Sequence, residues 1–214
     1  MRTRDASVAF DRLCARVRRC FACASLAAGG ASACRMDFVH ILGDVNGPLD
    51  AGVLFVAEAP GRLGAARTGV PMTSDVTGRR FHAFLAIAGL ERERVFITNA
   101  ILCNPLSASG NNRRPSAREV AACRSFLSGQ LRLVRAPAVV ALGGVALEAL
   151  RRIAPHEAVL SRDAGRGMAW DAGGRARLLV PLYHPSIQST LTRPHEQQQR
   201  DWRALGRLVR EAPP

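Results

Sequence analysis

The sequence predicts an α/β fold in which a parallel sheet is covered by helices on both faces. Two observations carry this prediction. Short, continuous apolar runs recur along the 214-residue chain, and segments with a helical spacing of apolar residues alternate with them. Strands that are apolar throughout are buried on both faces, which is typical of parallel sheets between two helical layers.

The first strand is expected at Val53–Ala57, an apolar run that a turn at residues 59–61 ends. Gly89 marks the end of the helix that follows, since glycine is the usual residue just past a helix. The buried face of that helix has the spacing i, i+3, i+4 and i+7, formed by Phe81, Phe84, Leu85 and Ala88.

The middle of the chain repeats the pattern. A second strand is expected at Val95–Thr98. Residues 116–119 read Ser-Ala-Arg-Glu, a capping box that opens a helix reaching Leu131. A third strand, Ala138–Leu142, precedes a helix from Gly143 to Ile153.

An irregular stretch rich in Gly and Arg separates these elements from a fourth strand, Leu178–Leu182, and a last helix from about His195 to Glu211. We expect one domain over residues 1–214, with residues 1–50 as an appendage. No apolar run approaches a membrane span, and the charged N-terminus lacks the apolar segment of a signal peptide. These features predict a cytoplasmic protein with no membrane partner, and we expect a monomer.

Polar residues stand where three of the strands end. The segments are Glu58–Asp75, Asn99–Cys103 and His184–Thr190. Ligands of parallel sheets bind at the carboxyl ends of the strands. The three segments are therefore expected to converge on one crevice.

The formal net charge is +13, and the sequence contains no lysine, so arginine supplies every basic side chain except histidine. A charge of this size favours a polyanion such as nucleic acid, although arginine-rich composition alone also raises it. The absence of lysine excludes side-chain Schiff-base chemistry and a Walker A phosphate loop. No nucleotide cofactor is expected.

The six cysteines fall into two groups. Cys20 and Cys23 have the two-residue gap that lets two thiolates hold one metal or cluster, and Cys103 and Cys123 are the remaining candidate ligands. Four thiolates suit either zinc or an iron–sulfur cluster, and the sequence leaves both open. We expect the other two, Cys14 and Cys34, to be small buried hydrophobes.

Three ordered segments resemble the iron–sulfur uracil-DNA glycosylases. The first is Val53-Leu-Phe-Val-Ala-Glu-Ala-Pro-Gly61 with Arg67-Thr-Gly-Val-Pro-Met-Thr-Ser-Asp75. The second is Phe96-Ile-Thr-Asn-Ala-Ile-Leu-Cys-Asn-Pro105, and the third is Tyr183-His-Pro-Ser186, which is similar to the histidine motif of the wider superfamily. The resemblance runs from about Cys20 to Trp202.

The resemblance implies a three-layer αβα fold around a four-stranded parallel sheet. It implies a structural [4Fe-4S] cluster held by Cys20, Cys23, Cys103 and Cys123, and removal of uracil from DNA to leave an abasic site. Glu58 and Asn99 follow the family 4 pattern, whereas Asp75 follows family 5. Ala57 replaces a usual glycine. Met72 replaces the usual aromatic that stacks on the base, so other deaminated bases such as hypoxanthine and xanthine become possible substrates.

Each strand-end residue has an expected role in breaking the glycosidic bond. His184 donates a hydrogen bond to the departing uracil O2, and Asn99 matches uracil N3–H and O4. Either Asp75 or Glu58 orients the water and stabilises the cationic sugar, and Asp75 is preferred even though it also fits a helix N-cap. The expected base-binding residues are Ala59, Pro60, Gly61, Met72 and Ser186.

DNA contacts are expected around the crevice. Ile187 or Leu191 is the expected wedge that fills the gap left by the flipped base. The arginines expected to contact phosphates are Arg62, Arg67 and Arg193. Without lysine, the enzyme is expected to be monofunctional.

Two other functions compete with this interpretation. One is a weak or inactive relative that binds damaged DNA without turnover. A covalently DNA-linking relative is excluded, because no basic insertion lies between Asp75 and Arg80. The other is an electron-transfer iron–sulfur protein, which lacks a flavin or nicotinamide fingerprint.

Overall fold

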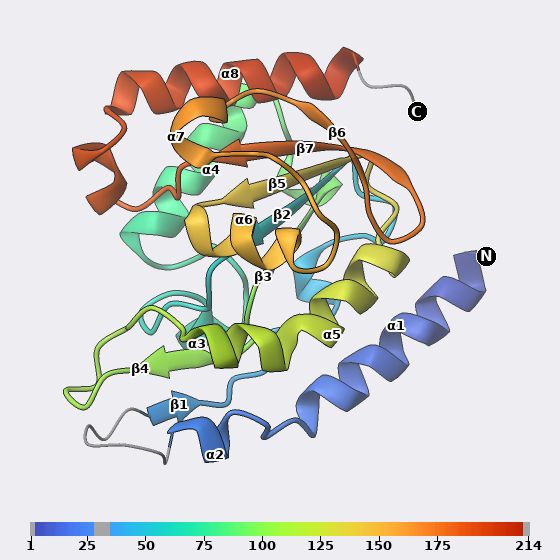
Figure 1. Ribbon diagram of the computed structural model, residues 1–214, viewed down its shortest axis with the longest axis vertical. Coiled ribbons are helices and arrows are strands. Elements are labelled where there is room, and N and C mark those ends of the chain that lie inside the picture. Colours follow the sequence, from blue (N-terminus) through green and yellow to red (C-terminus); the bar gives the residue numbers. More distant parts are fainter. Residues whose placement is uncertain (1–2, 28–34, 212–214) are drawn as a thin grey trace.

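The apolar runs of the sequence form the parallel core of a central sheet (Figure 1). The computed structural model describes residues 3–27 and 35–211. The parallel strands are β2 (Val53–Ala57), β3 (Val95–Asn99), β5 (Ala138–Leu142) and β7 (Ala176–Leu182). Their order is β3-β2-β5-β7, in parallel register throughout. All four strands were predicted, two of them with these bounds.

A fifth strand corrects the expected four-stranded sheet. Strand β6 (Met168–Asp171) pairs antiparallel with β7 and lies at the sheet edge. It falls in the stretch expected to be irregular. Only Trp170 of its four residues is buried, so an edge strand of this kind has no apolar run to mark it.

Helices cover both faces of the sheet, as predicted. On one face lie α4 (Val76–Ala88) and α8 (His195–Glu211), and on the other lie α1 (Thr3–Arg18), α5 (Ala117–Leu133) and α6 (Gly144–Arg151) (Figure 1). Trp202 of α8 stacks on Phe55 of β2 and on Phe84 of α4 within the first layer. Alternate strand residues point into the two cores.

The ends of two helices match the sequence signals for starting and stopping. Gly89 follows α4 in the left-handed conformation, with a φ of 68°. Ser116 and Glu119 form the predicted capping box, in which Ser116 Oγ accepts from Glu119 N and Glu119 Oε2 accepts from Ser116 N. These signals position the loops that precede α5 and follow α4.

The N-terminal segment contributes to the main core. Phe10, Leu13, Cys14 and Val17 of α1 are buried against α5 and the sheet, and Phe10 meets Phe96 of β3 edge to face. A small sheet of β1 (Arg35–Asp37) and β4 (Asn104–Leu106) lies next to α2 (Ala24–Ala27). Helix α1 had no predicted counterpart. The expected burial of Cys14 is confirmed, whereas Cys34 lies outside the described residues.

Short elements complete the chain. Helix α3 (Ala65–Thr68) lies between β2 and α4, and the 3-10 turns are η1 (Asp44–Asn46), η2 (Arg92–Arg94) and η3 (Gln188–Leu191). No helix in the described residues is both long and apolar enough to cross a bilayer.

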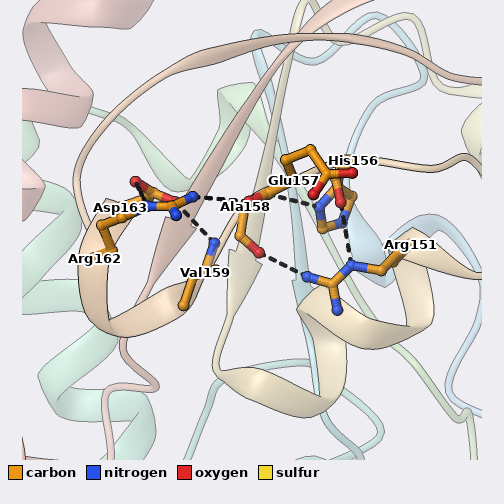
Figure 2. Close-up of polar contacts among 7 residues, drawn as sticks. All are labelled: Arg151, His156, Glu157, Ala158, Val159, Arg162 and Asp163. Carbon is orange, nitrogen blue, oxygen red and sulfur yellow. Dashed lines mark hydrogen bonds and ion pairs between the residues drawn. The ribbon is translucent and has the colours of Figure 1, made fainter.

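The chain between α6 and β6 is fixed by arginines (Figure 2). Arg151 donates to the backbone oxygens of His156 (3.2 Å) and Ala158 (2.6 Å). Arg162 pairs with Asp163 at the end of α7 (Leu160–Asp163). These polar contacts add to the apolar packing of this stretch, in which Ala158 is fully buried and Leu160 packs against the core.

Candidate active site

A cavity of about 550 Å³ lies at the carboxyl ends of the parallel strands. From β2 the chain passes to β3 on one side and then crosses to β5 on the other. Parallel sheets bind ligands at such a switch point. The cavity wall contains every residue predicted to be catalytic or to bind the base: Glu58, Ala59, Pro60, Gly61, Met72, Asp75, Asn99, His184 and Ser186. The predicted convergence of the three strand-end segments is confirmed.

Asp75 uses its two carboxylate oxygens differently. Oδ1 accepts a hydrogen bond from Gly78 N at 2.7 Å and caps α4. Oδ2 lies on the other side, against the loop of Gly61 and Gly64. The N-cap role and a place in the cavity therefore coexist in one side chain.

His184 follows β7 in a loop that neighbouring side chains hold in place. Arg80 Nε donates to Pro185 O at 2.8 Å, and Ser189 Oγ lies 2.6 Å from His184 O. Gln198 of α8 is buried and donates to Ser189 Oγ at 3.1 Å. The catalytic candidate is therefore braced by both helices of one layer.

Burial makes the His184 imidazole a poor base. It lowers the pKa of His184 from 6.5 to about 4, and the nearby Asp75 carboxylate opposes this shift. The imidazole is therefore neutral at neutral pH and keeps one N–H to donate. Gly143 lies next to this residue and has a φ of 93°, in the region that favours glycine, whereas a Cβ there would make only an ordinary contact with His184 Cβ at 3.5 Å.

Glu58 and Asn99 stand at the ends of neighbouring strands. The backbone of Ile101 donates to Glu58 O at 3.2 Å, which ties the two strand ends together. Burial raises the pKa of Glu58, and Arg114 opposes that shift. Asn99 is only 4% exposed and lines the cavity. Its amide can both donate and accept.

Met72 lies in a strained turn of the cavity wall. Its φ is 55°, in the left-handed region that non-glycine residues rarely adopt. Two residues later, Ser74 has a φ of 71°. Gly78 allows this turn to lie close to α4, because a Cβ on Gly78 would meet Met72 O at 2.7 Å. Such strain is typical of turns that shape a site.

One side of the cavity contains no predicted site residue. Asn104, Pro105, Asn112, Arg113 and Arg114 all line it. Only Asn104 and Pro105 directly follow the second strand-end segment, and that position is the signal that could have marked them. Asn104 is fully buried, and its neighbours orient its amide so that the nitrogen donates to Pro60 O (3.1 Å) and the oxygen accepts from Arg62 N (3.2 Å).

The residues predicted to contact DNA do not line the cavity. Arg62 and Arg67 are exposed. Ile187 is 56% exposed and Leu191, in η3, is 90% exposed. Arg193 differs from them, because its guanidinium forms a two-point ion pair with Asp201 at 2.6 and 2.9 Å. That pair leaves Arg193 less available to a phosphate than Arg62 or Arg67.

Four thiols gather near the small β1–β4 sheet. The pKa of Cys123 is raised to about 12, mainly by burial, and the thiols of Cys23, Cys103 and Cys20 contribute to this shift. Burial likewise raises the pKa of Cys103 to about 11, with contributions from Cys23 and Cys20. These thiols are therefore close enough to interact electrostatically. The predicted ligands form one group, which does not include Cys14.

The thiol group is not a compact site for one ion. Within residues 3–27 and 35–211, no three His, Cys, Asp or Glu side chains are arranged to hold a single metal ion. All four thiols are free, and three of them are buried.

Comparison with known proteins shows which protein family this chain is similar to. Residues 45–206 match the model of the uracil DNA glycosylase superfamily. The type-4 uracil-DNA glycosylase of Archaeoglobus fulgidus is 32% identical over 167 residues, which cover 77% of this chain and 80% of that protein. The type-4 enzyme of Thermotoga maritima is 32% identical over 66% of this chain and 68% of its own length. The type-5 uracil-DNA glycosylase of Mycobacterium tuberculosis is 33% identical over 65% of this chain and 56% of its own length.

Proposed function

This chain belongs to the uracil-DNA glycosylase superfamily, and we propose that it hydrolyses the N-glycosidic bond of uracil in DNA and leaves an abasic site. The observation that carries the proposal is the single cavity that joins Asp75, Asn99 and His184 at the strand ends. A base stacked inside a duplex cannot reach such a cavity. The target nucleotide must therefore be flipped out of the helix.

His184 stabilises the departing base. Cleavage leaves negative charge on uracil O2, and a neutral imidazole N–H can donate a hydrogen bond to it. Burial favours this form, because the lowered pKa of about 4 keeps the ring unprotonated at neutral pH. A preorganised donor of this type is worth about 3 kcal/mol of barrier. Arg80, Ser189 and Gln198 are positioning residues that hold the histidine loop.

Asp75 stabilises the positive charge that develops on the sugar and orients the attacking water. Its charge reaches His184 within the same cavity, and its Oδ2 is not used by the helix cap. Glu58 is the second carboxylate of the cavity. Because burial raises the pKa of Glu58, its charged form is disfavoured, and it is less suited to supply a fixed negative charge.

The remaining cavity residues recognise the base. The Asn99 amide matches the donor and acceptor pattern of uracil N3–H and O4. Met72 packs against the ring through its polarizable sulfur, which holds a base less rigidly than an aromatic side chain. Ala59, Pro60, Gly61 and Ser186 complete the wall around the base. Hypoxanthine and xanthine are further candidate substrates.

Exposed groups at the rim engage the DNA itself. Leu191 is the better wedge candidate, since a 90% exposed leucine contributes little to the core. Ile187, at 56%, is the alternative. Arg62 and Arg67 are candidates for phosphate contacts, and Arg193 is a weaker one because of its ion pair with Asp201.

The four gathered thiols of Cys20, Cys23, Cys103 and Cys123 would hold a [4Fe-4S] cluster. The donor set fits, because in such a cluster each thiolate binds its own iron, so the sulfurs do not converge on one ion. When bound, the cluster supplies a structural cross-link between the N-terminal segment, the β3–β4 connection and α5. A brown protein that contains thiolate-bound iron and absorbs at about 400 nm would support the cluster. A colourless protein containing zinc would contradict it.

An oligonucleotide panel tests the function. Duplexes carrying uracil, hypoxanthine, xanthine or hydroxymethyluracil are incubated with the protein, and abasic sites are then cleaved with alkali. We expect product from the uracil duplex. No product from any duplex would favour the alternative of an inactive DNA-binding relative, which neither the named relatives nor the cavity supports.

A trapping experiment tests the monofunctional chemistry. Because the sequence has no lysine, no side-chain amine can form a Schiff base with the abasic sugar. Borohydride added during uracil release should therefore capture no covalent adduct. A strong adduct would contradict this part of the proposal.

A further inference from the structure

Gly64 faces the carboxylate of Asp75 at a distance that leaves no room for a side chain. A Cβ built on Gly64 would lie 2.6 Å from Asp75 Oδ2 and 3.0 Å from Asp75 Cγ. Real Cβ atoms essentially never approach other atoms closer than 3.0 Å. Gly64 has a φ of −105°, which is not in the left-handed region, and a ψ of −114°, which lies outside the main regions for other residues. The close approach to Asp75 gives a second reason for glycine at this position.

Neither side of this contact can move aside easily. Asp75 Oδ1 is held at 2.7 Å by Gly78 N. On the other side, Thr68 Oγ1 contacts both Gly64 O (3.2 Å) and Thr73 Oγ1 (2.8 Å). These contacts tie the loop that contains Gly64 to the turn that contains Asp75. A side chain at position 64 would therefore force the Asp75 side chain to rotate away from its present orientation.

We infer that Gly64 is a positioning residue, whose missing side chain directs the Asp75 carboxylate into the cavity. The inference rests on the proposed role of Asp75 in uracil release. Gly61 forms the neighbouring part of the same surface, with a built Cβ 3.4 Å from Oδ2. That contact is ordinary, so the steric demand is concentrated at Gly64.

A stability cycle tests the contact without any activity. Gly64→Ala is measured alone, with Asp75→Ala and with Asp75→Asn. The alanine at position 64 should lower the melting temperature in the wild type and with Asp75→Asn, which keeps the clashing atoms. In the Asp75→Ala background, alanine at position 64 should lower the melting temperature much less. The contact with Thr73 O, 3.0 Å from a Cβ at position 64, is the same in all three backgrounds, so it does not affect the comparison. Equal losses in the three backgrounds would overturn the inference.

Single-turnover kinetics test the positioning. Gly64→Ala should slow uracil release by about tenfold or more with unchanged affinity for the duplex, and should add less than about twofold once Asp75 is alanine. The matched control is Gly144→Ala, because a Cβ there meets nothing within 4 Å. If Gly64→Ala releases uracil as fast as the control, the inference fails. If the wild type releases none, the proposed function fails, while the stability cycle still decides the contact.

Discussion

Burial at the cavity decides the protonation state of His184. The folded imidazole has a pKa of about 4, whereas the unfolded chain binds a proton at the ordinary value of 6.5. Between these two values the unfolded state holds more protons than the folded state. The contribution of His184 to stability therefore falls as the pH is lowered from 6.5 to about 4, and changes no further below that.

The free energy of unfolding over this window tests that burial. Wild type should lose more stability than His184→Gln between pH 6.5 and 4, because the variant removes the buried base. His156, whose pKa burial also lowers, remains in both proteins. The exposed His82 supplies the control variant, His82→Gln, which should behave as the wild type. Parallel curves for wild type and His184→Gln would show that folding does not lower the pKa of His184.

The sequence predicts the residues of the cavity better than it predicts their geometry. Asp75, Asn99 and His184 follow apolar runs, and parallel strands must bring their ends together. Arg113 carries no such signal, because its backbone N–H donates to Pro105 O of β4, eight residues earlier in the chain, at 3.0 Å. The opposing uses of the two Asp75 oxygens also depend on three-dimensional neighbours that no local pattern shows.

At the scale of elements, the start of α5 depends on one buried carboxylate. Glu119 is 2% exposed, pairs with Arg113 at 2.6 Å and accepts from Ser116 N at 2.7 Å. Breaking a buried pair leaves a charge without compensation, at a cost of about 3 kcal/mol. Glu148 pairs with Arg151 and Arg152, but its side chain is 44% exposed. Exposed pairs contribute about 0–1 kcal/mol.

Chemical denaturation of two alanine variants compares these carboxylates. Glu119→Ala should lower the free energy of unfolding by about 3 kcal/mol, and Glu148→Ala by less than about 1 kcal/mol. Equal losses would mean that burial of the pair contributes nothing to the stability of α5.

Most elements with an apolar face or a capping signal were predicted, with α1 as the exception, and edge elements were not. The four parallel strands, the capping box of α5 and the bounds of α8 follow from the sequence. Strands β6 and β1 have few buried residues, and β4 is only three residues long, so periodicity could not mark them. Their pairing depends on neighbours distant in the sequence.

For the whole molecule, we propose that the charge of +13 acts on DNA through the arginines near the cavity. Each phosphate contact releases counterions, so the logarithm of the binding constant falls with the logarithm of salt concentration. Arg114 is exposed and lines the cavity at the carboxyl ends of the strands, whereas Arg132 lies near the end of α5 that precedes the start of β5. The two arginines should therefore affect DNA binding differently.

Titrations of a uracil duplex at several salt concentrations measure this difference. Arg114→Ala should reduce the salt slope by about 1, and Arg132→Ala should leave it unchanged. Equal slopes for both variants would mean that the excess arginine is compositional.

The most direct test of the account is the single-turnover rate of uracil release by Asp75→Asn. Asparagine keeps the oxygen that caps α4 and removes the charge, so the melting temperature should stay near that of the wild type. The rate should fall by about 100-fold or more, while Asp171→Asn, at the exposed edge strand, should match the wild type. Uracil release by Asp75→Asn at the wild-type rate would contradict the account.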